Sequence, residues 1–81
     1  MDLTNLKNLE TGQRAKVLKI ISKGETKKRI IEMGVTPGVI IEVERVAPLG
    51  DPIEVKVRGY HLSLRKIEAE GINVEPIASK L

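Results

Sequence analysis

The sequence predicts a small, mostly β protein, folded as a strongly bent antiparallel barrel of about five strands with one or two short helices. Three observations support this prediction. The chain has 81 residues, enough for a single core and no more. Five short segments carry the apolar and charged alternation that is typical of half-buried strands. One segment between the first two of them changes to a helical period, and closing the sheet into a barrel would remove its exposed edges.

The N-terminal part begins with leucines three residues apart, Leu3, Leu6 and Leu9. This spacing indicates one helical turn, or an irregular lead-in that covers one end of a core. Residues 14–21 ("RAKVLKII") are rich in aliphatic residues, with charges at every second or third position. We therefore expect the first strand there, buried on one face.

Residues 26–34 ("TKKRIIEMG") form the predicted helix. Thr26 is a suitable capping residue, and Gly34 stands where a helix commonly ends in the left-handed conformation. Ile30, Ile31 and Met33 supply the apolar side. The following Thr36-Pro37-Gly38 has proline and glycine in the order that a type II turn requires.

The remaining strands follow from alternation. They are expected at residues 39–46 and 53–59, in the segment around Leu62 and Leu64, and at residues 72–77, with a short helical turn in "RKIEAEG". We expect one domain over residues 1–81, with its core at about 6–77. Residues 78–81 ("ASKL") are expected to be a frayed tail.

Composition excludes several classes of protein. The chain has no cysteine, and therefore neither disulfides nor thiolate metal sites. The N-terminus lacks the charged and apolar regions of a signal peptide, and no stretch approaches the ~20 apolar residues that cross a bilayer. We expect a soluble cytoplasmic protein.

Positive charge is concentrated in one segment. Residues 14–29 hold seven basic residues and one acid, which gives +6, so the rest of the chain sums to −3 because the total is +3. Such asymmetry favours an acidic partner or an anionic lipid surface. The alternative interpretation is a solvated strand and helix face without a partner.

Catalysis and nucleic-acid binding find little support. His61 is the only histidine, and no hydroxyl residue has a base at a spacing typical of covalent catalysis, so we expect no enzyme. Tyr60 is the only aromatic residue. Binders of single-stranded nucleic acid combine a basic groove with aromatic stacking platforms, so we do not expect nucleic acid as a partner.

A metal site is a weaker hypothesis. His61 could bind Fe(II) or Mn(II) together with Glu32, Glu68, Glu70 or Asp51, because nitrogen and oxygen ligands suit these ions. The spacing singles out none of these carboxylates. The alternative is a surface or partly packed histidine.

The loop of residues 47–52 ("APLGDP") has a structural role for most of its residues. Pro48 and Pro52 lack amide donors, Gly50 permits a positive φ, and Asp51 can accept from backbone amides. Leu49 remains as an apolar turn residue. We expect it to point inward and plug one end of the barrel; the alternative is an outward docking knob.

The order of these motifs resembles the FeoA family, small cytosolic proteins that accompany the ferrous-iron transporter FeoB. The resemblance runs from Leu6 to about Val74 and rests on a basic helix, two turn motifs and a final strand pair. The matching segments are "RIIEMG" (29–34), "TPG" (36–38), "APLGDP" (47–52), "GYHLSLR" (59–65) and "EAEGINV" (68–74).

The resemblance implies an SH3-like barrel and a non-catalytic adaptor that binds the cytosolic part of FeoB and supports Fe(II) uptake. Under this hypothesis Lys27, Lys28 and Arg29 supply positive charge at the contact with the partner. Leu49 and Asp51, in the 47–52 loop, also bind the partner. Arg29 has a competing role, in which its guanidinium binds a nearby carbonyl or carboxylate. No cofactor is required.

Two alternatives stay open. The family also occurs as the C-terminal domain of DtxR-type repressors, so the first alternative is a metal-sensing module that uses His61. Because the chain starts at Met1 with no helix-turn-helix ahead of it, we expect a free-standing protein. The second alternative is a weak homo-oligomer, which is also compatible with a small barrel.

Overall fold

The computed structural model describes residues 4–77 and contains one antiparallel sheet of six strands, in the order β1-β6-β2-β3-β4-β5. The strands are β1 (Thr4–Asn5), β2 (Arg14–Ile20), β3 (Ile40–Val46), β4 (Ile53–Val57), β5 (Tyr60–Leu64) and β6 (Ile72–Ile77). The helices are the 3₁₀ helix η1 (Leu6–Asn8), α1 (Gly24–Glu32) and α2 (Lys66–Glu70). The predicted tail, residues 78–81, and Leu3 lie outside the described residues.

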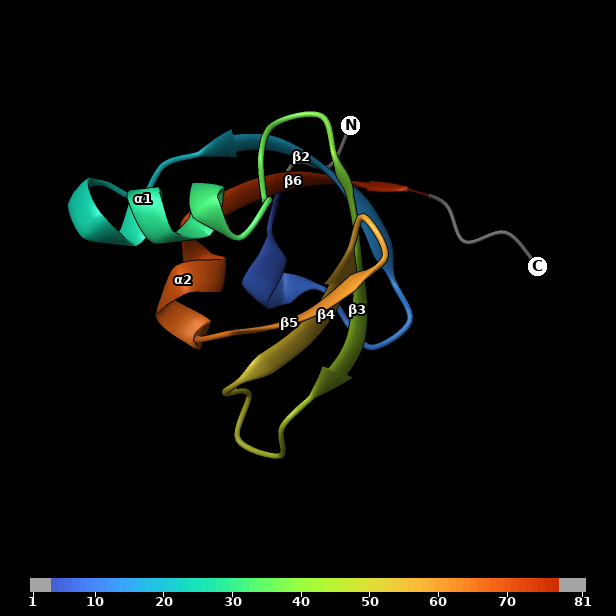
Figure 1. Ribbon diagram of the computed structural model, residues 1–81. Helices are drawn as coiled ribbons and strands as arrows, with labels where there is room; N and C mark the ends of the chain where they lie inside the picture. The colour runs from blue at the N-terminus through green and yellow to red at the C-terminus, as the bar shows by residue number, and fades with distance from the viewer. Residues whose placement is uncertain (1–3, 78–81) are drawn as a thin grey trace.

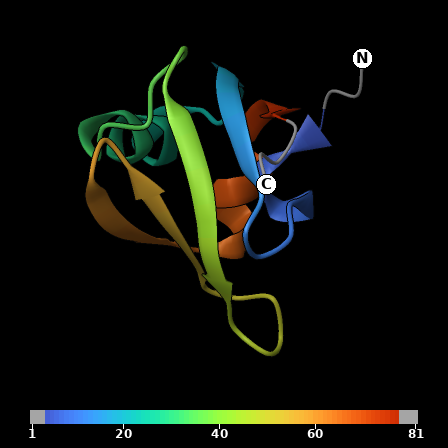
Figure 2. The same ribbon diagram turned by 90° about the vertical axis from the view of Figure 1, so that its right-hand side faces the viewer.

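The sheet curls on itself into an SH3-like barrel, as Figures 1 and 2 show. Strands β6 and β2 lie on one side, β4 and β5 on the other, and β3 connects the two sides. Alternation decides which side chains enter the core between them. In β4, Ile53, Val55 and Val57 are buried while Glu54 and Lys56 are exposed.

The barrel has one strand more than expected. Strand β1 has only two residues, too few for any alternation, and it is recognised by its pairing with β6, where Thr4 lies opposite Val74. The predicted helical turn then follows as η1, with Leu6 and Leu9 buried. Leu6 and Leu9 thus belong to the core, as the spacing predicted for them.

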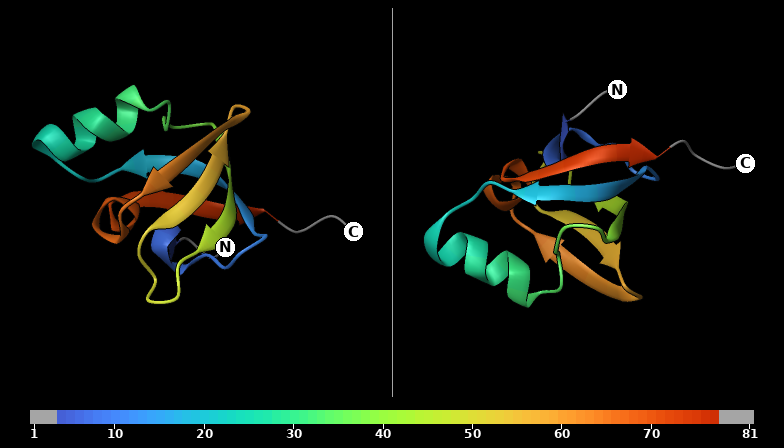
Figure 3. Two further views of the ribbon diagram at one scale, coloured as in Figure 1. Left: turned by 60° about the horizontal axis from the view of Figure 1, so that its bottom comes forward. Right: turned by 90° about the horizontal axis from the view of Figure 1, so that it is seen from above.

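Helix α1 begins two residues earlier than expected. Its N-cap is Lys23, and no side chain caps the first turn, so the prediction that Thr26 caps the helix was wrong. Glu25 in the first turn is favourably placed beside the free amides at the N-terminus. Ile30 is the one residue of this helix that is buried. The helix projects from the side of the barrel in Figures 1 and 3.

Helix α2 is tied to both other helices through its carboxylates. Glu68 is 5% exposed; its Oε1 accepts the backbone N–H of Arg65 at 2.8 Å, and its Oε2 lies 3.0 Å from Arg29 Nε on α1. Glu70 pairs with Lys7 of η1 at 3.4 Å. The competing role of Arg29, in which its guanidinium binds a carbonyl or carboxylate, is therefore the one observed, with Glu68 as the carboxylate.

The turn at residues 36–38 forms as predicted. Gly38 has φ +97°, and the N–H of Val39 donates to the carbonyl of Thr36 at 3.2 Å. Proline followed by a residue of positive φ is the type II arrangement.

Within residues 4–77, no helix is long and apolar enough to cross a membrane.

Candidate functional site

Leu49 points away from the barrel. Its side chain is 92% exposed, so the expectation that it plugs one end of the core was wrong, and the alternative outward orientation is the one observed. Leu6, Leu9 and, from α2, Ala69 belong to the buried core, whereas Leu49 does not. An exposed leucine at the tip of a loop gains nothing from folding, because its apolar surface stays in water.

The loop that carries Leu49 is braced on both sides. The N–H of Gly50 donates to the carbonyl of Ala47 at 2.7 Å, and the N–H of Ala47 donates to the carbonyl of Pro52 at 3.1 Å. Gly50 has φ +84°, which the turn requires and glycine adopts without strain. These bonds close the loop at the lower end of the barrel in Figure 2.

Asp51 anchors the same loop to α2. Its Oδ1 accepts the backbone N–H of Lys66 at 3.0 Å. The sequence predicted that Asp51 would accept from an amide, and the amide belongs to a helix 15 residues away. Ile67, the next residue of that helix, is 69% exposed. The loop therefore holds Leu49 in a fixed position and is tied to a helix that carries a second exposed aliphatic residue.

The predicted basic contact residues lie elsewhere. Lys27 and Lys28 are exposed on α1 and form no ion pair within residues 4–77. Arg29 is engaged with Glu68 and braces α1 against α2. Figures 1 and 3 place α1 and the 47–52 loop at different ends of the molecule. The fold brings Leu49 and Asp51 together and separates them from the lysines.

His61 lies on the outer face of the sheet and contacts a carboxylate that the sequence did not indicate. Its Nδ1 is 2.8 Å from Oε1 of Glu44, and the two side chains meet across β4. A register shift between Val43 and Arg45 makes Glu44 the additional residue of β3 there. The carboxylate beside His61 is therefore Glu44, and not one of the four that the sequence offered, which were Glu32, Glu68, Glu70 and Asp51.

A cavity of about 200 Å³ opens beside this pair and is also lined by Glu54, Leu62 and Ser63. In the part of the chain that the structure describes, no three His, Cys, Asp or Glu side chains are grouped closely enough to hold a metal ion. The arrangement provides a histidine–carboxylate contact on a surface that is mostly open to solvent.

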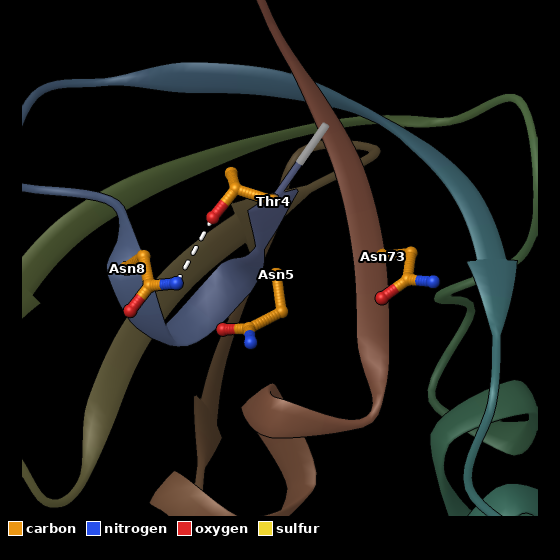
Figure 4. Close-up of a pocket in the computed structure, with 4 residues that line it drawn as sticks. All are labelled: Thr4, Asn5, Asn8 and Asn73. Carbon is orange, nitrogen blue, oxygen red and sulfur yellow. Dashed lines mark hydrogen bonds between the residues drawn. The ribbon is translucent and has the colours of Figure 1, made fainter. Parts of the chain in front are cut away.

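A second cavity, of about 320 Å³, is lined by polar side chains alone: Thr4, Asn5, Asn8 and Asn73 (Figure 4). Asn8 Nδ2 donates to Thr4 Oγ1 at 3.0 Å. The buried Oδ1 of Asn5 has no hydrogen-bond partner among the described residues. None of these side chains ionises in the ordinary pH range, so this cavity can offer hydrogen bonds but no acid–base chemistry.

Comparison with known proteins resolves the family. The family profile described as the FeoA domain matches residues 4–76, nearly the entire barrel. The chain belongs to the FeoA family. A FeoA-like protein from Clostridium acetobutylicum, solved by NMR, superposes with a TM-score of 0.89 at 37% identity, covering 100% of this chain and 94% of that one.

Two further relatives extend the comparison. The Fe(2+) transport protein A/Fe(2+) transporter FeoB fusion protein of Porphyromonas gingivalis is 40% identical over 74 residues; these are 91% of this FeoA domain and 9% of the fusion protein. The chain thus spans about a tenth of that relative. Stenotrophomonas maltophilia FeoA, described as a procaryotic SH3 domain protein complexed with zinc, shares the fold at 24% identity and a TM-score of 0.79, covering 89% of each chain.

Sequence reasoning missed three features of this FeoA domain. The contact between His61 and Glu44 depends on the register across β4, and the polar cavity depends on the pairing of β1 with β6. The bond from Lys66 to Asp51 joins a loop to a helix. One signal for the contact between His61 and Glu44 is present in the sequence. In a sheet with the order β3-β4-β5, the alternation of these strands places Glu44 and His61 on the same outer face.

Proposed function

We propose that this chain is a non-catalytic accessory protein of ferrous iron transport, which acts in the cytosol by binding the cytosolic part of a FeoB-like transporter. The observation that carries the proposal is the 40% identical relative in which a domain of this family is joined to the transporter in one polypeptide. In the fusion protein the linker keeps the two domains at a high effective concentration, so that they can stay in contact. Where the two domains are separate chains, the same contact requires that they bind each other.

The 47–52 loop supplies the apolar anchor of this contact. Leu49 is almost entirely exposed, and three hydrogen bonds hold its loop before any partner arrives. A contact made by a preorganised loop loses little conformational entropy on binding. Burying an exposed leucine in an apolar pocket contributes about 1.5–3 kcal/mol to binding.

Replacing Leu49 with serine is therefore expected to weaken binding of the purified cytosolic domain of a cognate transporter by about tenfold or more. The fold should not change, since the side chain contributes nothing to the core. Calorimetric titration measures the affinity, and an amide NMR spectrum of the variant checks the fold. Tyr60→Ser, at a 71% exposed position at the start of β5, is the matched control. Equal affinity of Leu49→Ser and the unmodified chain would contradict the assignment of the loop.

Lys27 and Lys28 of α1 are assigned a role in the diffusional encounter with the transporter. Because charge acts over a distance of about 10 Å at moderate salt, they accelerate association without a place in the final contact. Lys27→Glu combined with Lys28→Glu is expected to lower the association rate about tenfold at low salt and to flatten its salt dependence. The dissociation rate should stay the same.

Stopped-flow mixing at several salt concentrations measures both rates. The control is Arg45→Glu with Lys56→Glu. This double variant reverses two exposed charges on strands β3 and β4, away from α1, and has the same net charge as the α1 double variant. If both double variants slow association equally, net charge and not the position of the lysines determines the rate. If neither does, the steering role is wrong.

A further inference from the structure

The charged residues of α1 lie at different angles around the helix, and its two acids, Glu25 and Glu32, lie roughly opposite Ile30. Ile30 faces the core, and successive residues of an α-helix are turned by about 100°. Arg29 therefore lies on one flank, where it meets Glu68 of α2 at 3.0 Å. Lys27 and Ile31 lie on the other flank, about 40° apart. The second flank consequently faces away from α2.

This second flank is basic and partly apolar. Lys23 precedes Lys27 by one turn, Lys28 lies at the border of the two flanks, and all three lysines are exposed. Ile31, one turn after Lys27 and Lys28, is 42% exposed. None of these lysines forms an ion pair with any residue from 4 to 77. Together, Lys23, Lys27, Lys28 and Ile31 are named the α1 patch.

The chemistry of the α1 patch fits an anionic lipid surface better than a protein or a nucleic acid. Protein interfaces are depleted in lysine and enriched in arginine and aromatic residues. Single-stranded nucleic acid needs stacking platforms, and the only aromatic residue, Tyr60, is on a different element. Lipid phosphates form a diffuse negative layer that flexible lysines can meet without fixed geometry, while an aliphatic side chain reaches between the headgroups.

We infer that the α1 patch binds the surface of a membrane that contains anionic phospholipids. The inference rests on the proposed function only in placing the chain beside a membrane transporter. Helix α1 projects from the barrel, so that a flat surface can approach it (Figure 3). The 47–52 loop lies at a different end and stays accessible in this orientation. The contact is weak and salt-sensitive, because a small number of lysines carry it.

Co-sedimentation with vesicles tests the inference without any transporter. We expect the chain to pellet with vesicles of phosphatidylcholine and phosphatidylglycerol at low salt, and to remain in the supernatant with phosphatidylcholine alone. Lys27→Gln combined with Lys28→Gln should lower the partition coefficient about 30-fold, at about fivefold for each lysine near an anionic surface. Adding Ile31→Ser to this double variant should lower the partition coefficient by a further few-fold.

Two controls distinguish binding through the α1 patch from a general effect of net charge and from binding through the 47–52 loop. Arg45→Gln with Lys56→Gln removes the same two charges, from +3 to +1, from exposed positions on β3 and β4, and should retain most of the binding. Leu49→Ser should bind vesicles like the unmodified chain, although its binding to the transporter is expected to be weaker. Equal losses in the two double variants, or equal binding to neutral and anionic vesicles, would overturn the inference. Failure of transporter binding would leave the vesicle result unaffected.

Discussion

Replacing Ile30 with alanine is expected to lower the free energy of unfolding by about 2–5 kcal/mol, the range found for large aliphatic residues in a packed core. Ile30 is 0% exposed and is the one residue through which α1 is buried. A helix of nine residues is not stable by itself in water. Loss of its anchor should therefore also release α1 from the barrel. Chemical denaturation followed by circular dichroism measures the change.

The neighbouring position provides the matched control. Ile31→Ala removes the same atoms from a side chain that is 42% exposed, and should cost less than about 1 kcal/mol. Similar losses at both positions would mean that α1 does not contribute to stability through Ile30. In that case the division of the helix into a buried side and two flanks would be wrong.

Replacing Glu68 with alanine is expected to cost about 1.5–3 kcal/mol of unfolding free energy, the range for hydrogen bonds to a charged group. The carboxylate is buried and has two partners, the N–H of Arg65 at the start of α2 and the guanidinium of Arg29 on α1. The side chain of Arg29 is 54% exposed and can return to water, so the ion pair contributes less than the backbone bond. Thermal and chemical denaturation measure the loss.

Glu70→Ala, in the same helix, is the control. Its pair with Lys7 is partly exposed, and surface pairs contribute about 0–1 kcal/mol. A double-mutant cycle with Arg29→Gln then separates the two partners of Glu68. A loss at position 68 no larger than that at position 70 would contradict the role of Glu68 as the brace between the helices.

The parts of the fold that follow a local pattern could be predicted from the sequence. Strand β6 has the predicted bounds, and β3 begins one residue later than expected, because alternation of apolar and charged residues determines which face is buried. The turn at Gly38 was also predictable, since proline and glycine restrict the backbone directly. The number of short strands predicted a small antiparallel barrel, and the family resemblance implied that this barrel is SH3-like.

Features that depend on distant contacts could not be predicted. The direction of Leu49 follows from how the loop is closed and from the bond between Asp51 and Lys66, and no local pattern contains that bond. The carboxylate that meets His61 depends on a register shift in β3. For Arg29, the residue type indicated a carbonyl or a carboxylate as one possible partner, while only the packing of α2 identifies Glu68.

The pairing of β1 and β6 has a kinetic consequence. These are the first and last strands of the described chain, and β6 also completes one side of β2, where Val17 lies opposite Val74. The pairings of β6 with β1 and β2 can form only after nearly the whole described chain is available, because they join strands that are far apart in sequence and require a long loop to close. During synthesis β3, β4 and β5 can pair as hairpins, while β2 retains an open edge until residues 72–77 have been made. Completion of the sheet is therefore a late step, because it requires strand β6.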